Sequence, residues 1–359
     1  MAGLAATIAR RIRHEGPLSI AAFMAIALHD PRGGYYARHD PLGGAGDFIT
    51  APEISQIFGE LIGLWCADLW RHIGRPQSVI LAELGPGSGA LFDDFLRAAA
   101  ILPEFRGALE LYLVEASPVL RARQQRRMRS VGAHFIAGVD ALPPGPLLLV
   151  ANEFLDALPI RQLVRGRVEW AERLVALDAG DRLVFADGPE NPGLTLLVPP
   201  ALRTQPPGTV VEICPAAAAL AAALGERLAT QPGAALFVDY GYFPSAPGAT
   251  LAALRRHAAA GVLDDPGSTD LSAHVDFAAF AAAAQAAGAV VLGPVAQGRF
   301  LAALGAEARL AKLSAGASEV QRGVLTSGLE RLIDPAQMGN LFKVLALISP
   351  GLPAPAGFD

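Results

Sequence analysis

The sequence is poor in lysine and in cysteine, and it carries no excess of positive charge. Lysine occurs only at Lys312 and Lys343 among 359 residues, and the formal net charge is −5 with a pI near 5.8. This balance argues against a protein that binds nucleic acid through a general basic surface. The two cysteines, Cys66 and Cys214, lie far apart in apolar surroundings. We therefore expect buried thiols in a reducing compartment and no metal site.

Long hydrophobic runs are also missing. The apolar segments 214–224 and 277–284 are short and rich in alanine, so we expect no membrane insertion. The N-terminus shows no basic start followed by a long apolar run, so no signal peptide is evident. Hydrophobic residues nevertheless make up 52% of the chain, which allows a large core in one large domain or two ordinary ones.

What the sequence does contain is a glycine-rich turn between an expected strand and an expected helix. The apolar residues 79–81 lead to Glu83, and Gly85, Gly87 and Gly89 follow before helical spacing begins. Glycine allows a positive φ and a close approach of ligand to backbone. The free N–H groups of the following helix attract electron-rich groups. The stretch therefore predicts a nucleotide-type binding turn.

Strands and helices alternate after this turn, which predicts an α/β fold with a Rossmann-like parallel sheet wrapped by helices. We expect a helical N-terminal region over 1–75 with a glycine-rich lid loop at 33–53, an α/β domain over 76–350, and a frayed tail over 351–359. The expected insertions are a strand-rich one at about 160–210, an irregular one at 242–276, and a helical one at 298–335.

The acids at successive strand ends suggest which nucleotide the turn binds. The spacing Gly85-x-Gly87-x-x-Ala90 loosely fits the dinucleotide fingerprint, so an NAD-dependent oxidoreductase is a fair alternative. However, Glu83 lies directly before the glycines, where it would repel a pyrophosphate but tolerate a cationic cofactor. Glu115 suits ribose hydroxyls, and Asp140 suits an adenine amino group. Together these residues favour S-adenosylmethionine (SAM).

Nine segments, in order along the chain, form a recognisable set of motifs: 34–36, 46–55, 58–60, 83–89, 114–118, 151–159, 238–241, 270–276 and 339–344. Together they resemble one family, the MidA-like methyltransferases, which include the mitochondrial complex I assembly-factor arginine methyltransferase. Small departures are the absence of a threonine shortly after Gly89, and Ser272 where threonine is expected. The resemblance implies a class I SAM-dependent methyltransferase fold.

The resemblance also implies an activity, a partner and a location. The implied reaction is methyl transfer from SAM to a protein arginine, giving symmetric dimethylarginine. The implied substrate is the 49 kDa-type peripheral subunit of respiratory complex I (NADH:quinone oxidoreductase) during assembly. Bacterial members would act in the cytoplasm and eukaryotic relatives in the mitochondrial matrix. A non-catalytic assembly chaperone that retains a SAM site is a further alternative, and the oligomeric state is open.

Arginine methylation needs acids beside the methyl donor, because guanidinium stays protonated at neutral pH and is a poor nucleophile. A carboxylate can hold its planar fork and accept the proton lost around transfer. Glu153 and Asp156 are the best candidates, since they follow strand 147–151 at the expected cofactor crevice, and Asn152 offers an amide to orient a ligand. The alternative is that these are turn residues that cap a helix.

The glycine-rich lid supplies further candidates. Glu53 fits a capping box with Thr50; alternatively Thr50, Pro52 and Glu53 close the cofactor pocket or reach the substrate. Tyr35 and Tyr36 could wall the arginine channel or simply anchor the lid.

Two residues of the second half complete the set of candidates. His274 could accept a proton or serve as a structural hydrogen-bond partner. Asp239, at the end of strand 235–239, lies near the crevice by topology and could bind substrate or form an ion pair.

Overall fold

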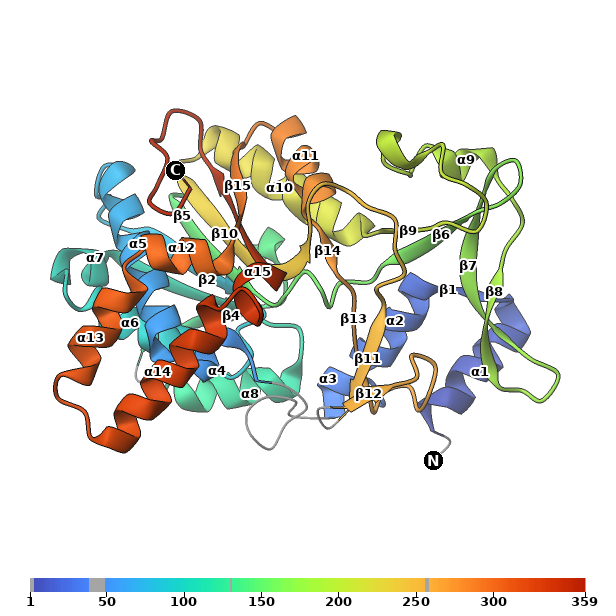
Figure 1. Cartoon of the computed structure of the whole chain (residues 1–359), viewed down its shortest axis with the longest axis horizontal. Helices are drawn as coiled ribbons and strands as arrows, with labels where there is room; N and C mark the ends of the chain where they lie inside the picture. Colours follow the sequence, from blue (N-terminus) through green and yellow to red (C-terminus); the bar gives the residue numbers. More distant parts are fainter. Residues whose placement is uncertain (1–2, 39–48, 130, 256–257, 359) are drawn as a thin grey trace.

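A central sheet of eight strands organises the computed structural model, which describes residues 3–38, 49–129, 131–255 and 258–358 (Figure 1). Its main path runs β15-β16-β10-β5-β2-β3-β4, and β14 pairs with β10. These strands are β2 (Val79–Leu84), β3 (Leu109–Val114), β4 (His134–Ile136), β5 (Leu147–Asn152), β10 (Gly233–Tyr242), β14 (Val275–Asp276), β15 (Val290–Ala296) and β16 (Phe342–Ile348). Strand β16 pairs antiparallel with both β10 and β15, and the other pairings in this sheet are parallel. The predicted Rossmann-like α/β fold is confirmed.

Helices cover both faces of this sheet, and the alternation of side chains explains why. Every residue of β2 and β5 is buried, as in parallel sheets that are covered on both faces. Leu81 and Leu148 point to one core, with α5 (Gln56–His72) and α6 (Ala90–Ala99). The opposite face packs on α10 (Pro215–Thr230) and α11 (Phe277–Ala286). The shorter helices around the sheet are α7 (Pro103–Ala108) and α8 (Pro118–Arg127).

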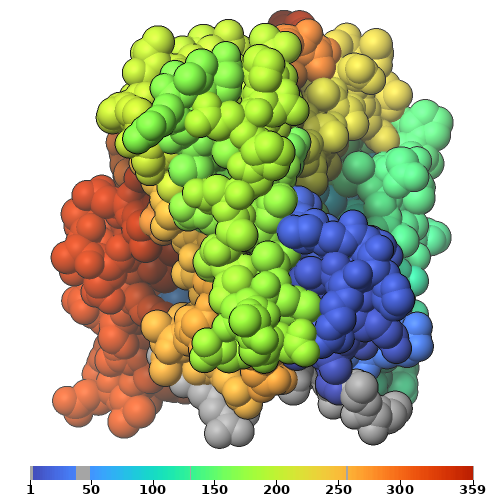
Figure 2. Space-filling model, turned by 90° about the vertical axis from the view of Figure 1, so that its right-hand side faces the viewer, coloured from blue at the N-terminus to red at the C-terminus, as the bar shows by residue number. Residues whose placement is uncertain are grey.

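A second lobe forms around a five-stranded sheet, as Figures 1 and 2 show. Its strands are β1 (Leu18–Ser19), β6 (Arg161–Arg165), β7 (Trp170–Leu177), β8 (Leu183–Asp187) and β9 (Val210–Ile213), with α9 (Pro192–Thr195) nearby in sequence. Helices α1 (Leu4–Glu15) and α2 (Ile20–His29) pack against it, and in Figure 2 the blue N-terminal helices lie against the green insertion. Their core also takes residues from the small sheet of β11 (Ala252–Arg255), β12 (Ala258–Ala260) and β13 (Asp270–Ser272).

The described part of the N-terminal 75 residues is mostly helical, but its helices pack against different parts of the molecule. Helices α1 and α2 bury their apolar faces in the second lobe, whereas α5 buries its face against the central sheet. Between them lie α3 (Tyr35–Arg38) and α4 (Ala51–Ile54). Much of the expected lid loop, including the part of the family signature at 46–48, lies outside the described residues, as does His257.

The expected capping box at α4 is wrong. Thr50 is the N-cap residue, but its side chain makes no cap hydrogen bond. The backbone N–H of Ala51 instead donates to the carboxylate of Glu153, 102 positions away, at 3.1 Å. The helix then stops at Ile54, and Ser55 caps α5 by accepting from the N–H of Ile57. A tertiary contact thus replaces the local one that the sequence suggested.

The region between β15 and β16 is helical, and an ion pair joins it to helix α5 beside the central sheet. Helices α12 (Gln297–Ala303), α13 (Ala306–Ser314), α14 (Glu319–Ile333) and α15 (Met338–Leu341) lie between β15 and β16. Buried Glu60 on α5 forms ion pairs with Arg97 of α6 and Arg309 of α13. Within the described residues no helix is long and apolar enough to cross a membrane.

The tail after Pro350 is not frayed, contrary to expectation. The ring of Phe358 lies 5.4 Å from that of Phe300 and 6.5 Å from that of Trp65. The indole N–H of Trp65 also donates to the carbonyl of Ala356 at 3.2 Å. Aromatic burial late in the tail outweighs the flexibility that its proline and glycine content suggested.

Candidate active site

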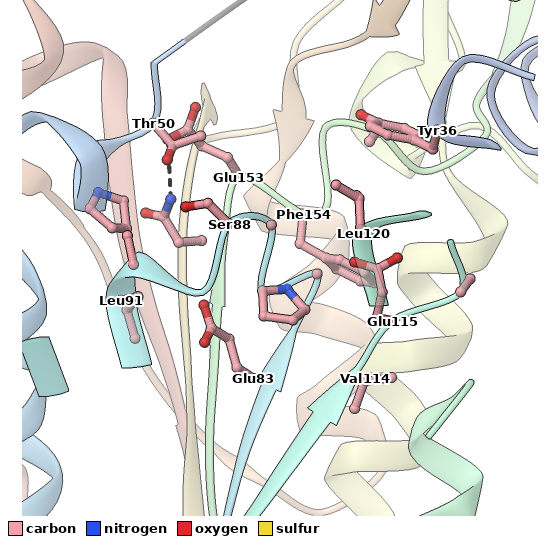
Figure 3. A pocket seen from close by; sticks show the side chains of 18 of the residues that line it. Tyr36, Thr50, Glu83, Ser88, Leu91, Val114, Glu115, Leu120, Glu153 and Phe154 are labelled. Carbon is pink, nitrogen blue, oxygen red and sulfur yellow. Dashed lines mark hydrogen bonds between the residues drawn. The ribbon is translucent and has the colours of Figure 1, made fainter. Parts of the chain in front are cut away.

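A cavity of about 150 Å³ opens at the carboxyl ends of β2, β3 and β5 (Figure 3). We call it the donor pocket. Among the sequence candidates it is lined by Tyr36, Thr50, Pro52, Glu83, Gly85, Gly87, Glu115, Asn152 and Glu153. Parallel strands of an open α/β sheet place ligands at this edge.

The glycine turn has the geometry that only glycine adopts easily. The φ angles of Gly85, Gly87 and Gly89 are +57°, +51° and +77°. A Cβ on Gly85 would come within 2.9 Å of the Phe154 ring, so this position also has no space for a side chain. Gly89 caps α6 and is not among the residues that line the pocket.

Glu83 and Glu115 end neighbouring strands beneath the turn (Figure 3). Burial raises the pKa of Glu83 to about 8, and its Oε2 atom has no hydrogen-bond partner among the described residues. Glu115 Oε1 accepts from the N–H of Ser117 at 2.7 Å, and its Oε2 accepts from Gln124 at 3.0 Å. Burial also raises the pKa of Glu115. Glu83 therefore offers an unpaired acceptor to a cationic ligand.

Glu153 stands at a strained position just after β5. Its φ is +50°, a left-handed conformation that is uncommon for glutamate and typical of functional sites. The Oε1 atom accepts from the N–H of Ala51 and from the amide of Asn152, both at 3.1 Å. Burial and the charge of Asp156 raise the pKa of Glu153 to about 7.

The turn after Glu153 is held from below by Asp239. One oxygen of Asp239 accepts from the N–H groups of Phe154, Leu155 and Asp156 at 3.1, 2.8 and 3.3 Å. Backbone amides thus take the place of the ion pair that we had considered. Asp239 lies outside the lining of the donor pocket, and its carboxylate holds the backbone of residues 154–156.

Asp156 is buried, and one of its two carboxylate oxygens lacks a hydrogen-bond partner among the described residues. Its Oδ2 atom accepts from the hydroxyl of Tyr240 at 2.6 Å, while Oδ1 has no partner among the described residues. Burial raises the pKa of Asp156 to about 6. Two more buried acceptors, Glu53 Oε2 and Asn152 Oδ1, are likewise unpaired there. We call Glu53, Asn152, Glu153 and Asp156 the acceptor cluster; no ion pair of these residues is found in the described ranges.

The remaining candidates lie elsewhere. Tyr35 is fully buried in the core of the second lobe and does not line the donor pocket. Asp140 is exposed and, like Gly89, does not line the pocket. His274 lines a separate cavity of about 570 Å³ beside α10 and α11, and burial lowers its pKa. Its ring contacts that of Tyr240 at 5.4 Å, so it reaches the acceptor cluster only through Tyr240.

Several residues at the site were missed by sequence reasoning. Gln124 joins Glu115 to the glycine turn by donating to the carbonyl of Gly87 at 2.9 Å. Tyr240 and Asp270 lie within family segments, which gave a signal, but their roles depend on long-range contacts. Nothing in the sequence around Gln124 distinguished it from a solvent-facing helix residue.

The parallel sheet, the glycine turn and the acid at each of two strand ends define a nucleotide-binding methyltransferase of the SAM-dependent class. Residues 61–295 match the family described as putative S-adenosyl-L-methionine-dependent methyltransferases. A crystal structure from Burkholderia thailandensis, a likely methyltransferase bound to S-adenosyl-homocysteine, is 30% identical with a TM-score of 0.85; the match covers 99% of this chain and 93% of that one.

Two similar proteins with named activities identify the family more closely. The mitochondrial protein arginine methyltransferase NDUFAF7 of Xenopus tropicalis is 34% identical over 97% of this chain and 87% of its own length. The Drosophila melanogaster homologue is 36% identical over 97% and 85%. The chain belongs to the MidA-like family of SAM-dependent methyltransferases. The expected fold, enzyme class and cofactor are thereby confirmed.

Proposed function

We propose that this protein methylates arginine in a protein substrate and that the acceptor cluster binds the guanidinium group. The observation that carries the proposal is that half-buried Glu153 and buried Asp156 lie beside the donor pocket without a countercharge in the described residues. Burying uncompensated carboxylates is unfavourable, so a cationic ligand is the natural complement. The names of the NDUFAF7 relatives support the same residue type as substrate.

The arrangement of the unpaired acceptor atoms favours an arginine side chain over a lysine side chain as the cationic ligand. A guanidinium group presents five N–H donors in one plane, whereas an ammonium presents three around a point. The unpaired atoms Glu53 Oε2, Asn152 Oδ1 and Asp156 Oδ1 belong to three separate side chains, and Glu153 adds a fourth group. Several acceptors in different directions match the planar fork better than a single charge.

On the donor side, the residues present fit SAM. Glu83 would bind the ammonium group through its unpaired oxygen, and Glu115 would bind ribose hydroxyls. Gly85 and Gly87 let the backbone approach the ligand, and Thr50 and Pro52 close the pocket from α4. Asp140 is proposed to reach the adenine amino group from the rim. SAM supplies an electrophilic methyl group.

On the acceptor side, methyl transfer would depend on how the carboxylates position the guanidinium group and localise its charge. Glu153 and Asp156 would fix the guanidinium and localise its charge, which raises the nucleophilicity of one nitrogen. Glu153, whose pKa is about 7, is suited to accept the proton released around transfer. His274 would act only at a distance, through Tyr240 and Asp156.

The finer proposal is symmetric dimethylation of the 49 kDa-type peripheral subunit of complex I, in the cytoplasm for bacterial members. Its support is the family resemblance and the mitochondrial NDUFAF7 names. The test incubates wild type and Glu153→Ala with the isolated subunit and with intact complex I, in the presence of SAM. Mass spectrometry should find dimethylarginine with wild type and a loss of at least 100-fold with the variant.

The outcomes of this experiment distinguish an arginine methyltransferase from an assembly chaperone and from a lysine methyltransferase. A glutamate to alanine change at exposed Glu226 provides the matched control and should leave methylation unchanged. Binding of SAM without methylation of either substrate by wild type would overturn the proposal and favour an assembly chaperone. Methylation of lysine instead would retain the enzyme class but reject guanidinium as the acceptor.

A further inference from the structure

Strand β13 brings two polar side chains to the acceptor cluster from the segment 242–276. Asp270 and Ser272 alternate with Leu271, whose side chain is buried in the core of the second lobe. Ser272 lies beside the phenol of Tyr240, and that phenol donates to Asp156 at 2.6 Å. We call Asp156, Tyr240, Asp270 and Ser272 the acceptor wall.

Tyr36 lies between this wall and the donor pocket. Its side chain lines the pocket, and its hydroxyl donates to Asp270 Oδ1 at 3.0 Å across 234 positions of sequence. Burial and the charges of Asp270 and Asp156 raise the pKa of Tyr36 well above its usual value. The phenol therefore stays protonated and remains a donor at every physiological pH.

The other end of Tyr36 is tied to a cofactor-binding acid. Its carbonyl accepts from the hydroxyl of Ser117 at 2.5 Å, and the N–H of Ser117 donates to Glu115 at 2.7 Å. In Figure 3 Tyr36 and Glu115 belong to different elements that border the same pocket. A continuous series of hydrogen bonds thus runs from Glu115 through Ser117 and Tyr36 to Asp270.

We propose that Tyr36 is a positioning residue that couples the two halves of the site. By fixing Asp270, and with it β13, relative to Glu115, it makes binding of the donor strengthen binding of the arginine substrate. Coupling of this kind is reciprocal between the two ligands. The inference rests on the proposed function, since the acceptor is taken to be a protein arginine.

The test compares Tyr36→Phe, which keeps the ring, with the matched change Tyr112→Phe on β3. Calorimetry measures SAM affinity, and acceptor binding is measured with and without S-adenosyl-homocysteine. For Tyr36→Phe we expect SAM affinity within about twofold of wild type. The acceptor KM should rise about tenfold, the loss typical of one hydrogen bond to a charged group, and the enhancement by S-adenosyl-homocysteine should fall towards one. Tyr112→Phe should leave all three unchanged.

A conservative variant separates coupling from mere attachment. Asp270→Asn keeps an oxygen for the Tyr36 hydroxyl, so it should retain most of the enhancement. A lower melting temperature for Tyr36→Phe with an unchanged acceptor KM and enhancement would overturn the inference, because the bond would then only attach α3 to β13. A loss of SAM affinity above tenfold would also overturn it. If wild type binds the protein but methylates no arginine, the proposed function fails, while the binding measurements still test the coupling.

Discussion

The donor pocket and the acceptor cluster are neighbours, but they are built in different ways. The donor pocket takes Glu83, the glycine turn and Glu115 from consecutive strand ends of one sheet. The acceptor cluster and wall take side chains from segments spread between residues 53 and 272, held by bonds such as Ala51–Glu153 and Tyr240–Asp156. The cofactor half thus comes mainly from the strand ends of the sheet, with Tyr36, Thr50 and Pro52 added from the N-terminal segment, whereas the acceptor half depends mostly on segments added to the sheet. The two halves should therefore respond separately to substitution.

The largest effect is expected from Asp156→Asn, which removes one charge from the acceptor cluster but keeps an acceptor for Tyr240. The apparent kcat/KM for the protein substrate should fall about 100-fold or more, as expected when a buried charge pair loses one partner. SAM affinity should stay within about twofold. Steady-state kinetics and calorimetry measure the two quantities, and a parallel loss of SAM affinity would contradict the separation of the halves.

The complementary change is Glu83→Gln in the donor pocket. SAM affinity should fall about 10- to 100-fold, because the negative charge opposite the ammonium group is lost although glutamine keeps an oxygen acceptor. At saturating SAM, kcat should remain within about threefold of wild type. Glu104→Gln, on an exposed carboxylate of α7, serves as the control. If kcat fell as far as the affinity, Glu83 would also act on the acceptor side.

The sequence could predict the donor half because each feature there is local. Glu83 before three glycines, and Glu115 after an apolar run, depend only on strand ends and turn chemistry. Glu153 was predicted for the same reason, since it follows β5. The role of Asp239 could not be predicted, because its carboxylate is taken up by three backbone N–H groups 83 to 85 positions away.

Other expectations failed where tertiary contacts outweighed local patterns. Thr50 and Glu53 have the spacing of a capping box, but Glu153 occupies the end of α4. Tyr35 and Tyr36 are adjacent, yet one is buried in the second lobe and the other lines the pocket. A sequence motif gives residue types and spacing, but the direction of each side chain depends on the core it meets.

The third prediction concerns backbone shape in the donor pocket. Gly85→Ala places a Cβ at φ +57° and 2.9 Å from Phe154. We expect a loss of about 1–2 kcal/mol in the free energy of unfolding and about tenfold weaker SAM binding. Gly107→Ala, in helix α7 with open space around it, should instead stabilise by about 0.5–1 kcal/mol. Equal effects of the two changes in thermal unfolding would refute the strain argument.

The fourth prediction is a pH dependence of the cofactor-free protein. The pKa values of Glu83, Glu153 and Asp156 are raised by burial to about 8, 7 and 6, above the usual 4.5 for glutamate and 3.8 for aspartate. The folded protein therefore holds protons that the unfolded chain releases. Stability is greatest below about pH 4 from these groups and is lost as pH rises through 6 to 8.

Thermal unfolding between pH 5.5 and 8.5 measures this slope, with an expected loss of about 6 kcal/mol across the range when the three groups titrate independently. Glu83→Gln should flatten the upper part, because its glutamine does not titrate. Saturating SAM should flatten it as well if Glu83 binds the ammonium group. A stability that rises with pH in the cofactor-free protein would show that these carboxylates are already charged when buried.

The smallest effect is expected from a change at Asp140. This change tests how much the rim of the donor pocket contributes to SAM binding compared with its interior. Asp140 is exposed in the short 3₁₀ helix Val139–Ala141, so a bond from it to the adenine amino group would compete with water. Asp140→Asn should weaken SAM binding about threefold, with kcat unchanged. Calorimetry with SAM and with methionine distinguishes the contributions, since methionine lacks the adenine and should bind both proteins equally. A loss above 30-fold would mean that Asp140 is buried when the cofactor binds and that the donor pocket, like the acceptor half, depends on segments outside the strand ends.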